Sequence, residues 1–333
     1  MLRKKFITTA IPWAITFFAI YYALKGVNWK IFISHLSGTS PLWLGVAVFL
    51  TVLSYFIRSW RWLYFFSQAP FSYAQSYCAL IIGFFMNNIL PARTGELVRA
   101  HVGAKLGNSS RTLMLATIAS ERLADGLTLS IFFVLFAVGK AEGELAKNLL
   151  YVAFFFAAAT VAAIVTIGLR AKVMIVAEKI HNRINHPISG YTVERLETFL
   201  KGLTPLTSLS HLPAIIFGSL LVWLIEAGVY VSVIQAYGKV MPLSYSILFM
   251  VAVNFSSLIP SAPGAIGVIE AVATTVLMSL GIEKELALAM VITQHAIQYF
   301  VVGLQGIVLM FAWKLGLNVE EEIELSSDKT GVK

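Results

Sequence analysis

The sequence predicts an all-α, polytopic integral membrane protein with six transmembrane helices, two broken re-entrant helical hairpins and both termini in the cytoplasm. Three observations predict this fold: the composition, the length of six apolar runs, and the interruption of two further apolar stretches by Pro and Gly. Of the 333 residues, 58% are hydrophobic and 13% are charged, against roughly one quarter charged residues in an average soluble domain. The mean hydropathy is +0.79. A chain of this composition needs lipid around it.

Six apolar runs are long enough to cross a membrane, since a hydrocarbon core of about 30 Å needs about 20 residues of helix. They cover residues 6–24, 42–64, 112–138, 148–169, 212–237 and 286–313. The first run follows Arg3, Lys4 and Lys5, as the apolar part of a signal peptide would. It lacks a convincing small-residue cleavage site and more runs follow, so we expect a retained helix.

The distribution of basic residues predicts the orientation, because short cytoplasmic connections carry an excess of Lys and Arg. Basic residues end the second run, precede the third and fill the connection between the fourth and fifth, whereas the other connections hold only sparse lysines. The clusters assigned to the cytoplasm are Arg58 and Arg61; Arg93, Arg99, Lys105 and Arg111; and Arg170, Lys172, Lys179, Arg183, Arg195 and Lys201. This asymmetry predicts six crossings with both termini inside.

Two apolar stretches do not fit as simple crossings. Residues 73–90 begin and end on the cytoplasmic side by the charge count, which predicts a re-entrant hairpin that ends in the interrupted segment 87–96. Pro91 and Gly95 interrupt the helix there, and the freed backbone groups must face protein or water. Residues 243–281, split at 254–270, form a second hairpin that enters from outside. The alternative is two ordinary kinked helices, since Pro and Gly are common in membrane helices.

The two broken stretches occupy corresponding places in two halves of the chain. Glu96 precedes Glu121 by 25 residues, and Glu270 precedes His295 by the same 25. We expect one membrane domain over residues 1–315, with repeats of opposite topology at about 6–138 and 148–314, followed by an acidic, disordered cytoplasmic tail at 316–333. Paired interrupted segments of this kind indicate the binding site of a transporter.

Ionisable side chains lie inside the predicted membrane segments. Glu121, Arg122 and Asp125 begin about 14 Å into the third helix, and Glu121 and Asp125 share one face. Charges at such depth usually face the bundle interior or a wet cavity; the alternative is a salt-bridge cluster that only locks helices together.

Glu270 follows Gly264 by six residues, which we interpret as too deep for stabilisation by the first turn of a helix. It is either functional or a protonated, silent glutamate. Glu226 and His295 are weaker signals, because one polar group in a helix often only bonds to a neighbour.

Arg93 and Arg99 flank Gly95 and Glu96 beside an expected helix start. Free amides, the positive end of the helix dipole and guanidinium groups together suit a phosphate, so this segment is a candidate cytoplasmic site for a lipid headgroup. The alternative is that both arginines only enforce topology at the anionic inner leaflet. Residues 261–264 are expected to open a half-helix from the outer side, where amides would receive the same headgroup.

These segments resemble the transmembrane region of the lysylphosphatidylglycerol synthase family, the flippase-like domain also found at the amino end of the bacterial multiple peptide resistance factor. The resemblance covers about residues 10–315 and is carried by Asn88, Pro91, Arg93, Gly95, Glu96 and Arg99; by Glu121, Arg122 and Asp125; and by Pro260, Pro263, Gly264, Gly267 and Glu270. It implies a bacterial or archaeal protein of the inner (cytoplasmic) membrane, without the soluble synthase domain. Such a protein moves, or helps to move, an anionic or aminoacylated phospholipid or a polyprenyl-linked lipid. Ala92 and the pair Gln294 and His295 depart from the family pattern, which often has Gly and a basic residue there.

The resulting hypothesis is a lipid transporter whose substrate path includes the residues that carry the resemblance, together with Glu226, Asn254 and His295. A membrane-embedded enzyme of lipid or polyprenyl-glycan synthesis is the first alternative, with Glu121, Asp125 and His295 as its candidates. An accessory subunit of another membrane enzyme is the second. A single cysteine, Cys78, excludes an internal disulfide and a thiolate zinc motif. We expect no enzymatic activity, metal or cofactor. The expected partners are membrane lipids, with a homo-oligomer or a lipid-biosynthesis enzyme as further candidates and no nucleic acid.

Overall fold

The computed structural model describes residues 2–137, 139, 143–184, 186–259 and 261–313, and within these ranges all regular structure is helical. The predicted tail at 316–333 and Pro260 lie outside the described residues. The helices, in chain order, are α1 (Leu2–Leu24), α2 (Trp29–Ser37), α3 (Pro41–Leu63), α4 (Tyr73–Ile89), η1 (Pro91–Arg93), α5 (Gly95–Leu106), α6 (Arg111–Phe132), η2 (Phe133–Ala137), α7 (Gly143–Gly168), α8 (Arg170–Ile184), α9 (Pro187–Leu203), η4 (Thr204–Thr207), α10 (Leu212–Ala236), α11 (Leu243–Ser256), η5 (Pro263–Ala265), α12 (Val268–Ser279) and α13 (Lys284–Ala312).

Each of the six predicted apolar runs falls on a helix, namely α1, α3, α6 with its continuation η2, α7, α10 and α13. Four helical segments are both long and apolar enough to cross a membrane: Pro41–Leu63, Leu150–Gly168, Leu212–Ala236 and Lys284–Ala312. The apolar part of α1 is shorter, Pro12–Leu24, and α6 carries three charged side chains in its middle. Three helices were not predicted from the sequence: α2, and α8 and α9 within residues 170–203.

The first broken stretch is a helical hairpin, because α4 and α5 pack against each other on either side of η1. A capping box of Ser72 and Gln75 starts α4. Leu90, which precedes Pro91, has φ −98° and ψ 141° and so ends the helix in an extended conformation. The break after Ile89 thus lies at the tip of the hairpin, and α5 forms its second arm as far as Leu106. The prediction from the sequence places the end of the hairpin at residue 90, because it interprets the break as the end of the hairpin.

The second broken stretch is also a hairpin, formed by α11 and α12 around η5. The two hairpins run in opposite directions and their tips meet. The open end of the first lies with α9, since Gln75 Nε2 donates to Leu106 O (3.2 Å) and α9 bonds to the start of α6. At the tips, Arg93 Nη2 donates to Ser257 Oγ (2.8 Å).

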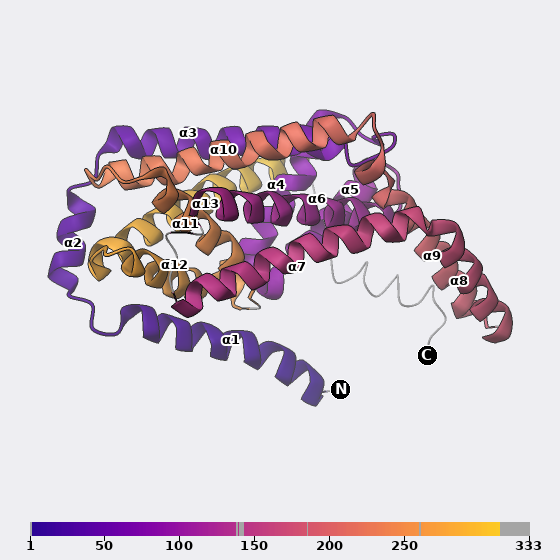
Figure 1. Ribbon diagram of the computed structural model, residues 1–333, viewed down its shortest axis with the longest axis horizontal. Coiled ribbons are helices and arrows are strands. Elements are labelled where there is room, and N and C mark those ends of the chain that lie inside the picture. The colour runs from indigo at the N-terminus through magenta and orange to yellow at the C-terminus, as the bar shows by residue number, and fades with distance from the viewer. Residues whose placement is uncertain (1, 138, 140–142, 185, 260, 314–333) are drawn as a thin grey trace.

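Helices α3 and α10 pack against each other along their length and are antiparallel (Figure 1). Ser40 N donates to Ala236 O (2.8 Å), and near the other end Arg61 Nη1 donates to Ser219 Oγ (2.9 Å). The remaining contacts show the same two-fold pattern, because α4 packs on α13 while its counterpart α11 packs on η2, the end of α6. Such reciprocal packing supports an inverted repeat of α3–α6 and α10–α13, which lie inside the predicted repeats at 6–138 and 148–314.

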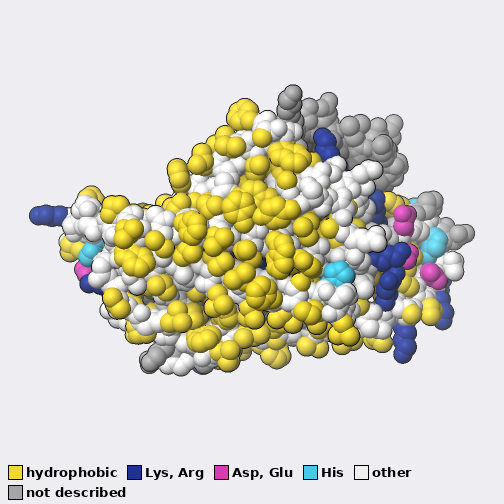
Figure 2. All heavy atoms as spheres, turned by 90° about the horizontal axis from the view of Figure 1, so that it is seen from above, with side chains coloured by type: hydrophobic (Ala, Val, Ile, Leu, Met, Phe, Trp, Pro, Cys, Tyr) yellow, Lys and Arg dark blue, Asp and Glu magenta, His cyan; other side chains and the backbone are white. Residues whose placement is uncertain are grey.

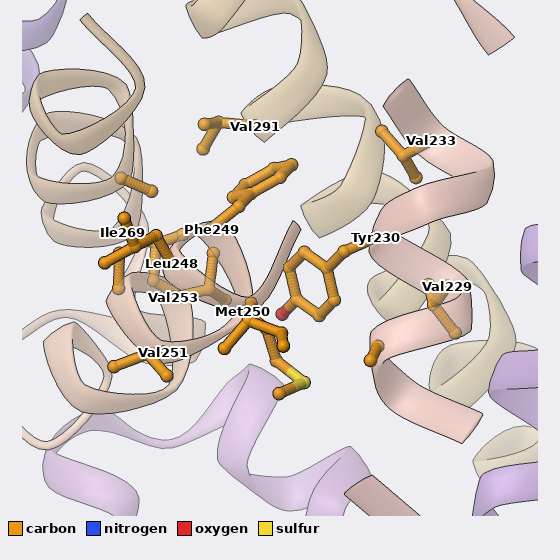
Figure 3. Close-up of a cluster of buried hydrophobic side chains, with 14 of the residues drawn as sticks. Val229, Tyr230, Val233, Leu248, Phe249, Met250, Val251, Val253, Ile269 and Val291 are labelled. Atoms are coloured by element: carbon orange, nitrogen blue, oxygen red, sulfur yellow. The ribbon is translucent and has the colours of Figure 1, made fainter. Parts of the chain in front are cut away.

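One cluster of buried hydrophobic side chains has its centre where α10, α11, α12 and α13 meet, as Figure 3 shows with Tyr230, Phe249, Ile269 and Val291, and it extends to α3, α4 and α6. On the face that Figure 2 shows, hydrophobic side chains cover the middle, whereas charged side chains gather toward the two ends, mostly at the end that carries α8 and α9. An apolar belt between charged ends is the surface that a membrane-spanning protein presents to lipid.

Candidate functional site

Eight charged side chains from four helices form an arginine–carboxylate network behind the hairpin tips; six are buried, and Glu96 and Arg122 are half-buried. Its members are Arg58 and Arg61 of α3; Glu96 and Arg99 of α5; Glu121, Arg122 and Asp125 of α6; and Glu226 of α10. Four positive and four negative charges balance, so that no net charge is buried, which is the arrangement an interior of low dielectric requires.

Arg61 lies at the centre of the network with no solvent exposure. Its Nη1 donates to Asp125 Oδ1 (2.7 Å) and its Nη2 to Glu121 Oε1 (3.3 Å). The predicted shared face of Glu121 and Asp125 is thus confirmed, because one guanidinium contacts both. Trp223 Nε1 donates to the same Asp125 oxygen (3.1 Å).

Arg58 connects this centre to α10. Its Nη2 donates to Glu226 Oε1 (3.2 Å), and its Nη1 lies 3.6 Å from Asp125 Oδ2. Ser54 Oγ donates to the same Glu226 oxygen (2.9 Å). The prediction from the sequence uses Arg58 and Arg61 as basic residues at the cytoplasmic end of a crossing. In the structure both side chains are buried, because the carboxylates of α6 and α10 need partners.

Arg99 is also buried, at 1% exposure. Its Nη2 donates to Glu121 Oε2 (2.7 Å), and its guanidinium stacks on the Trp62 ring at 3.9 Å. The expectation that Arg99 offers a phosphate site next to Arg93 is not supported by this geometry, since the side chain points into the network and away from open space.

A cavity of about 160 Å³, here called the central cavity, lies where the two hairpin tips meet. Arg58, Arg93 and Arg122 line it together with the carboxylates of Glu96 and Glu226. Its lining also includes Asn88, Asn254, Ser257, Ile259, Ser261, Gly264, His295, Gln298 and Tyr299. Residues from both broken segments thus line the central cavity together with four members of the network, Arg58, Glu96, Arg122 and Glu226. The other four members, Arg61, Arg99, Glu121 and Asp125, lie behind this lining.

Arg122 lines the central cavity and is one of the half-buried members of the network. Its Nε lies 3.1 Å from Glu96 Oε1, and longer contacts of 3.8 and 3.7 Å reach Glu121 and Asp125. Within the described residues, its buried Nε and Nη2 meet no hydrogen-bond criterion. The guanidinium lines the central cavity, where its positive charge can attract an anion.

Glu270 of α12 and His295 of α13, which the sequence relates only by their spacing, are in contact. His295 Nδ1 lies 2.6 Å from Glu270 Oε1 and His295 Nε2 lies 3.0 Å from Gly264 O. Both ring nitrogens thus face oxygen atoms, one of a carboxylate and one of the backbone. In the first hairpin the partner of Glu96 is Arg122, the residue next to Glu121.

The interpretation of Glu270 as too deep for the first helical turn is wrong. Gly264 and Gly267 have φ of 65° and 85°, conformations that delay the start of the helix. Helix α12 therefore begins at Val268, and Glu270 lies in its first turn, where its Oε2 accepts from Gly267 N (2.6 Å). For the same reason residues 261–264 do not open the half-helix; Pro263 belongs to the short η5.

Two predicted glycines act through close packing. A Cβ at Gly95 would lie 2.2 Å from Gly83 O, and one at Gly267 would lie 2.7 Å from the Ile20 side chain. Gly95 thus allows α4 and α5 to approach, and Gly267 allows α1 to cross the second tip. Pro91 is exposed at the first tip.

The sequence does not single out Arg58 and Arg61 as site residues, nor Ser257 at the second tip. One signal was available for the arginines: within a chain of few charges, two arginines three residues apart inside an apolar run need carboxylates from other helices. Ser257 gave no signal, because a serine beside a helix end is common in any membrane protein.

The fold and this site together define a multi-pass membrane protein in which two opposed helical hairpins enclose a polar cavity backed by a neutral charge network. The chain belongs to the family described as the lysylphosphatidylglycerol synthase TM region, which it matches over residues 9–306.

The chain is similar to a UPF0104 membrane protein of Methanocaldococcus jannaschii, with 25% identity over 227 residues, 68% of this chain and 93% of that protein. It is also similar to a UPF0104 membrane protein of Methanothermobacter thermautotrophicus, with 25% identity over 270 residues, 75% of this chain and 77% of that protein. No solved structure matches the chain.

Proposed function

We propose that this protein transports a lipid with an anionic headgroup across the cytoplasmic membrane, and that the headgroup passes through the central cavity. The observation that carries the proposal is the charge of the cavity wall. Arg93 lines the cavity in addition to the neutral arginine–carboxylate network, so these nine side chains sum to one positive charge. A phosphate in the cavity would meet Arg93 and Arg122 without adding an unbalanced charge to the interior.

The size of the central cavity favours a headgroup over a whole lipid. Pockets that enclose drug-sized ligands measure about 300–1,000 Å³, whereas the central cavity measures about 160 Å³. Candidate substrates are phospholipids, including aminoacylated ones, and polyprenyl-linked phosphates. Their hydrocarbon would remain outside the central cavity.

The proposed topology has six crossings, two re-entrant hairpins and cytoplasmic termini. The hairpin arms support it, because α4, α5, α11 and α12 have 17, 12, 14 and 12 residues, fewer than the roughly 20 that a crossing needs. The opposite directions of the hairpins and the antiparallel packing of α3 and α10 fit an inverted repeat, in which a midplane site is exposed alternately to the two sides. The basic end with α8 and α9 would face the cytoplasm.

The transport proposal is tested by reconstitution of the full chain into liposomes that contain a headgroup-labelled anionic phospholipid. We expect Arg122→Ala to reduce translocation at least about tenfold, since a hydrogen bond to a charged group contributes about 1.5–3 kcal/mol. Arg183→Ala is the matched control, because this arginine is exposed on α8. Equal translocation by wild type, Arg122→Ala and protein-free vesicles would sink the proposal.

The same preparation separates transport from catalysis. If the protein is an enzyme of polyprenyl-glycan synthesis, incubation with a polyprenyl phosphate and a sugar donor yields a product that Arg122→Ala lacks. We expect no product.

Labelling of single cysteines in a Cys78→Ser background tests the topology. Both tips line one cavity, so the open ends of the hairpins are the informative positions. Tyr73 and Leu243, 40% and 52% exposed, should react with a membrane-impermeant reagent from opposite sides. Reaction of both from one side would exclude the inverted repeat.

A further inference from the structure

An apolar groove lies between α1 and α12, on the outer side of the second hairpin. Its volume is about 440 Å³. Ala14, Ile15, Phe18, Ala19 and Tyr22 of α1, Val268, Ala271 and Val272 of α12, and Ile259 of the second tip line it. None of these nine side chains is charged, and Ala14, Phe18 and Tyr22 follow each other at four-residue intervals, so they form one wall along α1.

Helix α1 lies beside α12, away from most of the bundle (Figure 1). It is held at the tip, where Ala262 N donates to Thr16 Oγ1 (2.9 Å), and by the close approach of Ile20 to Gly267. Ala19 and Ala271 pack directly against each other's helix in a small cluster. The groove therefore has two fixed walls.

The groove and the central cavity lie next to each other, because Ile259 lines both. On one side of this residue the lining consists of arginines, carboxylates and asparagines, and on the other it is apolar. Ser261 and Ala262, which follow in the chain after Pro260, line the polar side, while Thr16 of α1 bonds to Ala262. A ligand that fills both spaces must be polar at one end and hydrocarbon at the other.

We infer that the groove binds one hydrocarbon chain of the lipid whose anionic headgroup occupies the central cavity. The inference rests on the proposed function and specifies its substrate as an amphiphile held at both ends. A helix of a second copy or of a partner protein fits less well, since a helix with its side chains is about 10–12 Å wide and α1 and α12 are already in contact. An acyl or prenyl chain is narrow enough to lie between them.

The test compares two radiolabelled probes that share a phosphate and differ in their hydrocarbon: dioleoylphosphatidylglycerol and glycerol 3-phosphate. Binding is measured by scintillation proximity on the purified full chain in detergent. Val272→Trp fills the groove, and Val161→Trp is the matched control, because Val161 is 60% exposed on the apolar surface of α7.

We expect Val272→Trp to weaken binding of the lipid by about tenfold, the effect of displacing roughly two chain methylenes, and to leave binding of glycerol 3-phosphate unchanged. Val161→Trp should change neither, and Arg122→Ala should weaken both. Phe18→Ala removes a wall side chain that is 72% exposed, a change that cannot unfold the core, and should also weaken only the lipid.

Each contrary result is distinct. If Arg122→Ala weakens both probes while Val272→Trp and Phe18→Ala weaken neither, the headgroup site stands and the groove inference is overturned. If the wild type binds both probes equally, the hydrocarbon of the lipid contributes nothing to binding, and the inference is overturned as well. If Arg122→Ala has no effect on either probe, the proposed function fails. Disulfide cross-linking of two copies through Val272→Cys, in the Cys78→Ser background, would assign the groove to a second copy.

Discussion

The charge balance of the arginine–carboxylate network makes Glu121 the residue whose neutralisation should cost most stability. Glu121→Gln keeps the shape of the side chain but leaves four arginines with three carboxylates inside the protein. Glu121 Oε1 and Oε2 bond to Arg61 and Arg99 at 3.3 and 2.7 Å, and both partners are buried. Removing one partner of a buried ion pair costs about 3–5 kcal/mol, mostly because the remaining charge loses its compensation.

The matched variant removes the excess charge. Arg99→Met in the Glu121→Gln background keeps an apolar stem beside Trp62 and returns the network to three positive and three negative charges. We therefore expect the double variant to be more stable than the sum of the single effects predicts, by at least about 2 kcal/mol, a coupling within the range of double-mutant cycles for residues in contact.

Cys78 provides the assay. It is the only cysteine of the chain and has no solvent exposure, so a thiol-reactive fluorophore reports unfolding during a thermal ramp in detergent. Glu121→Gln should lower Tm by roughly 4–7 °C, and Arg99→Met in that background should restore part of the loss. A Tm within about 2 °C of the wild type for Glu121→Gln, or strictly additive losses in the double variant, would refute the reasoning that the buried charges are mutually required.

Three further outcomes follow from the hairpin tips. Gly95→Ala should destabilise the protein by about 2–4 kcal/mol, because its Cβ would lie 2.2 Å from Gly83 O and overpacking against backbone cannot relax; an unchanged Tm would contradict this. Ser257→Ala removes the hydrogen bond from Arg93 that joins the two tips and should change transport rate while lowering stability by only about 1 kcal/mol, which parallel liposome and Tm measurements would show. Glu270→Gln exchanges the carboxylate that contacts His295 Nδ1 for a neutral amide and should lower stability by about 1–3 kcal/mol; an unchanged Tm would count against the importance of this contact.

The helices and both breaks could be predicted from the sequence because each depends on local chemistry. Apolar runs of about 20 residues must be helical in lipid, and all six fell on helices. Leu90 before Pro91 ends a helix by a steric clash that needs no tertiary information. The start of α12 was misplaced because the left-handed conformations at Gly264 and Gly267 cannot be read from their identity alone, since glycine permits such a φ without requiring it.

The site was predicted in part, and the difference lies in pairing. The Glu121 and Asp125 face follows from helical periodicity, but their partner Arg61 is 60 and 64 residues away and is located by the antiparallel packing of α3 and α10. Arg99 shows the opposite error. Its spacing from Gly95 suits a phosphate at a helix start, yet the rotation of α5 turns it toward Glu121.

The separation of these partners in the chain also sets the order in which the membrane domain can be assembled. Arg61 emerges from the ribosome 60 and 64 residues before Glu121 and Asp125, a delay of about 3–13 s at roughly 5–20 residues per second. Glu226, which accepts a hydrogen bond from Arg58, is synthesised 168 residues after it. Both arginines lie in the last six residues of α3, so their long side chains can reach interfacial water in the meantime. We therefore expect helix α3 to reach its final depth only after α6 and then α10 have been inserted and supply these carboxylates.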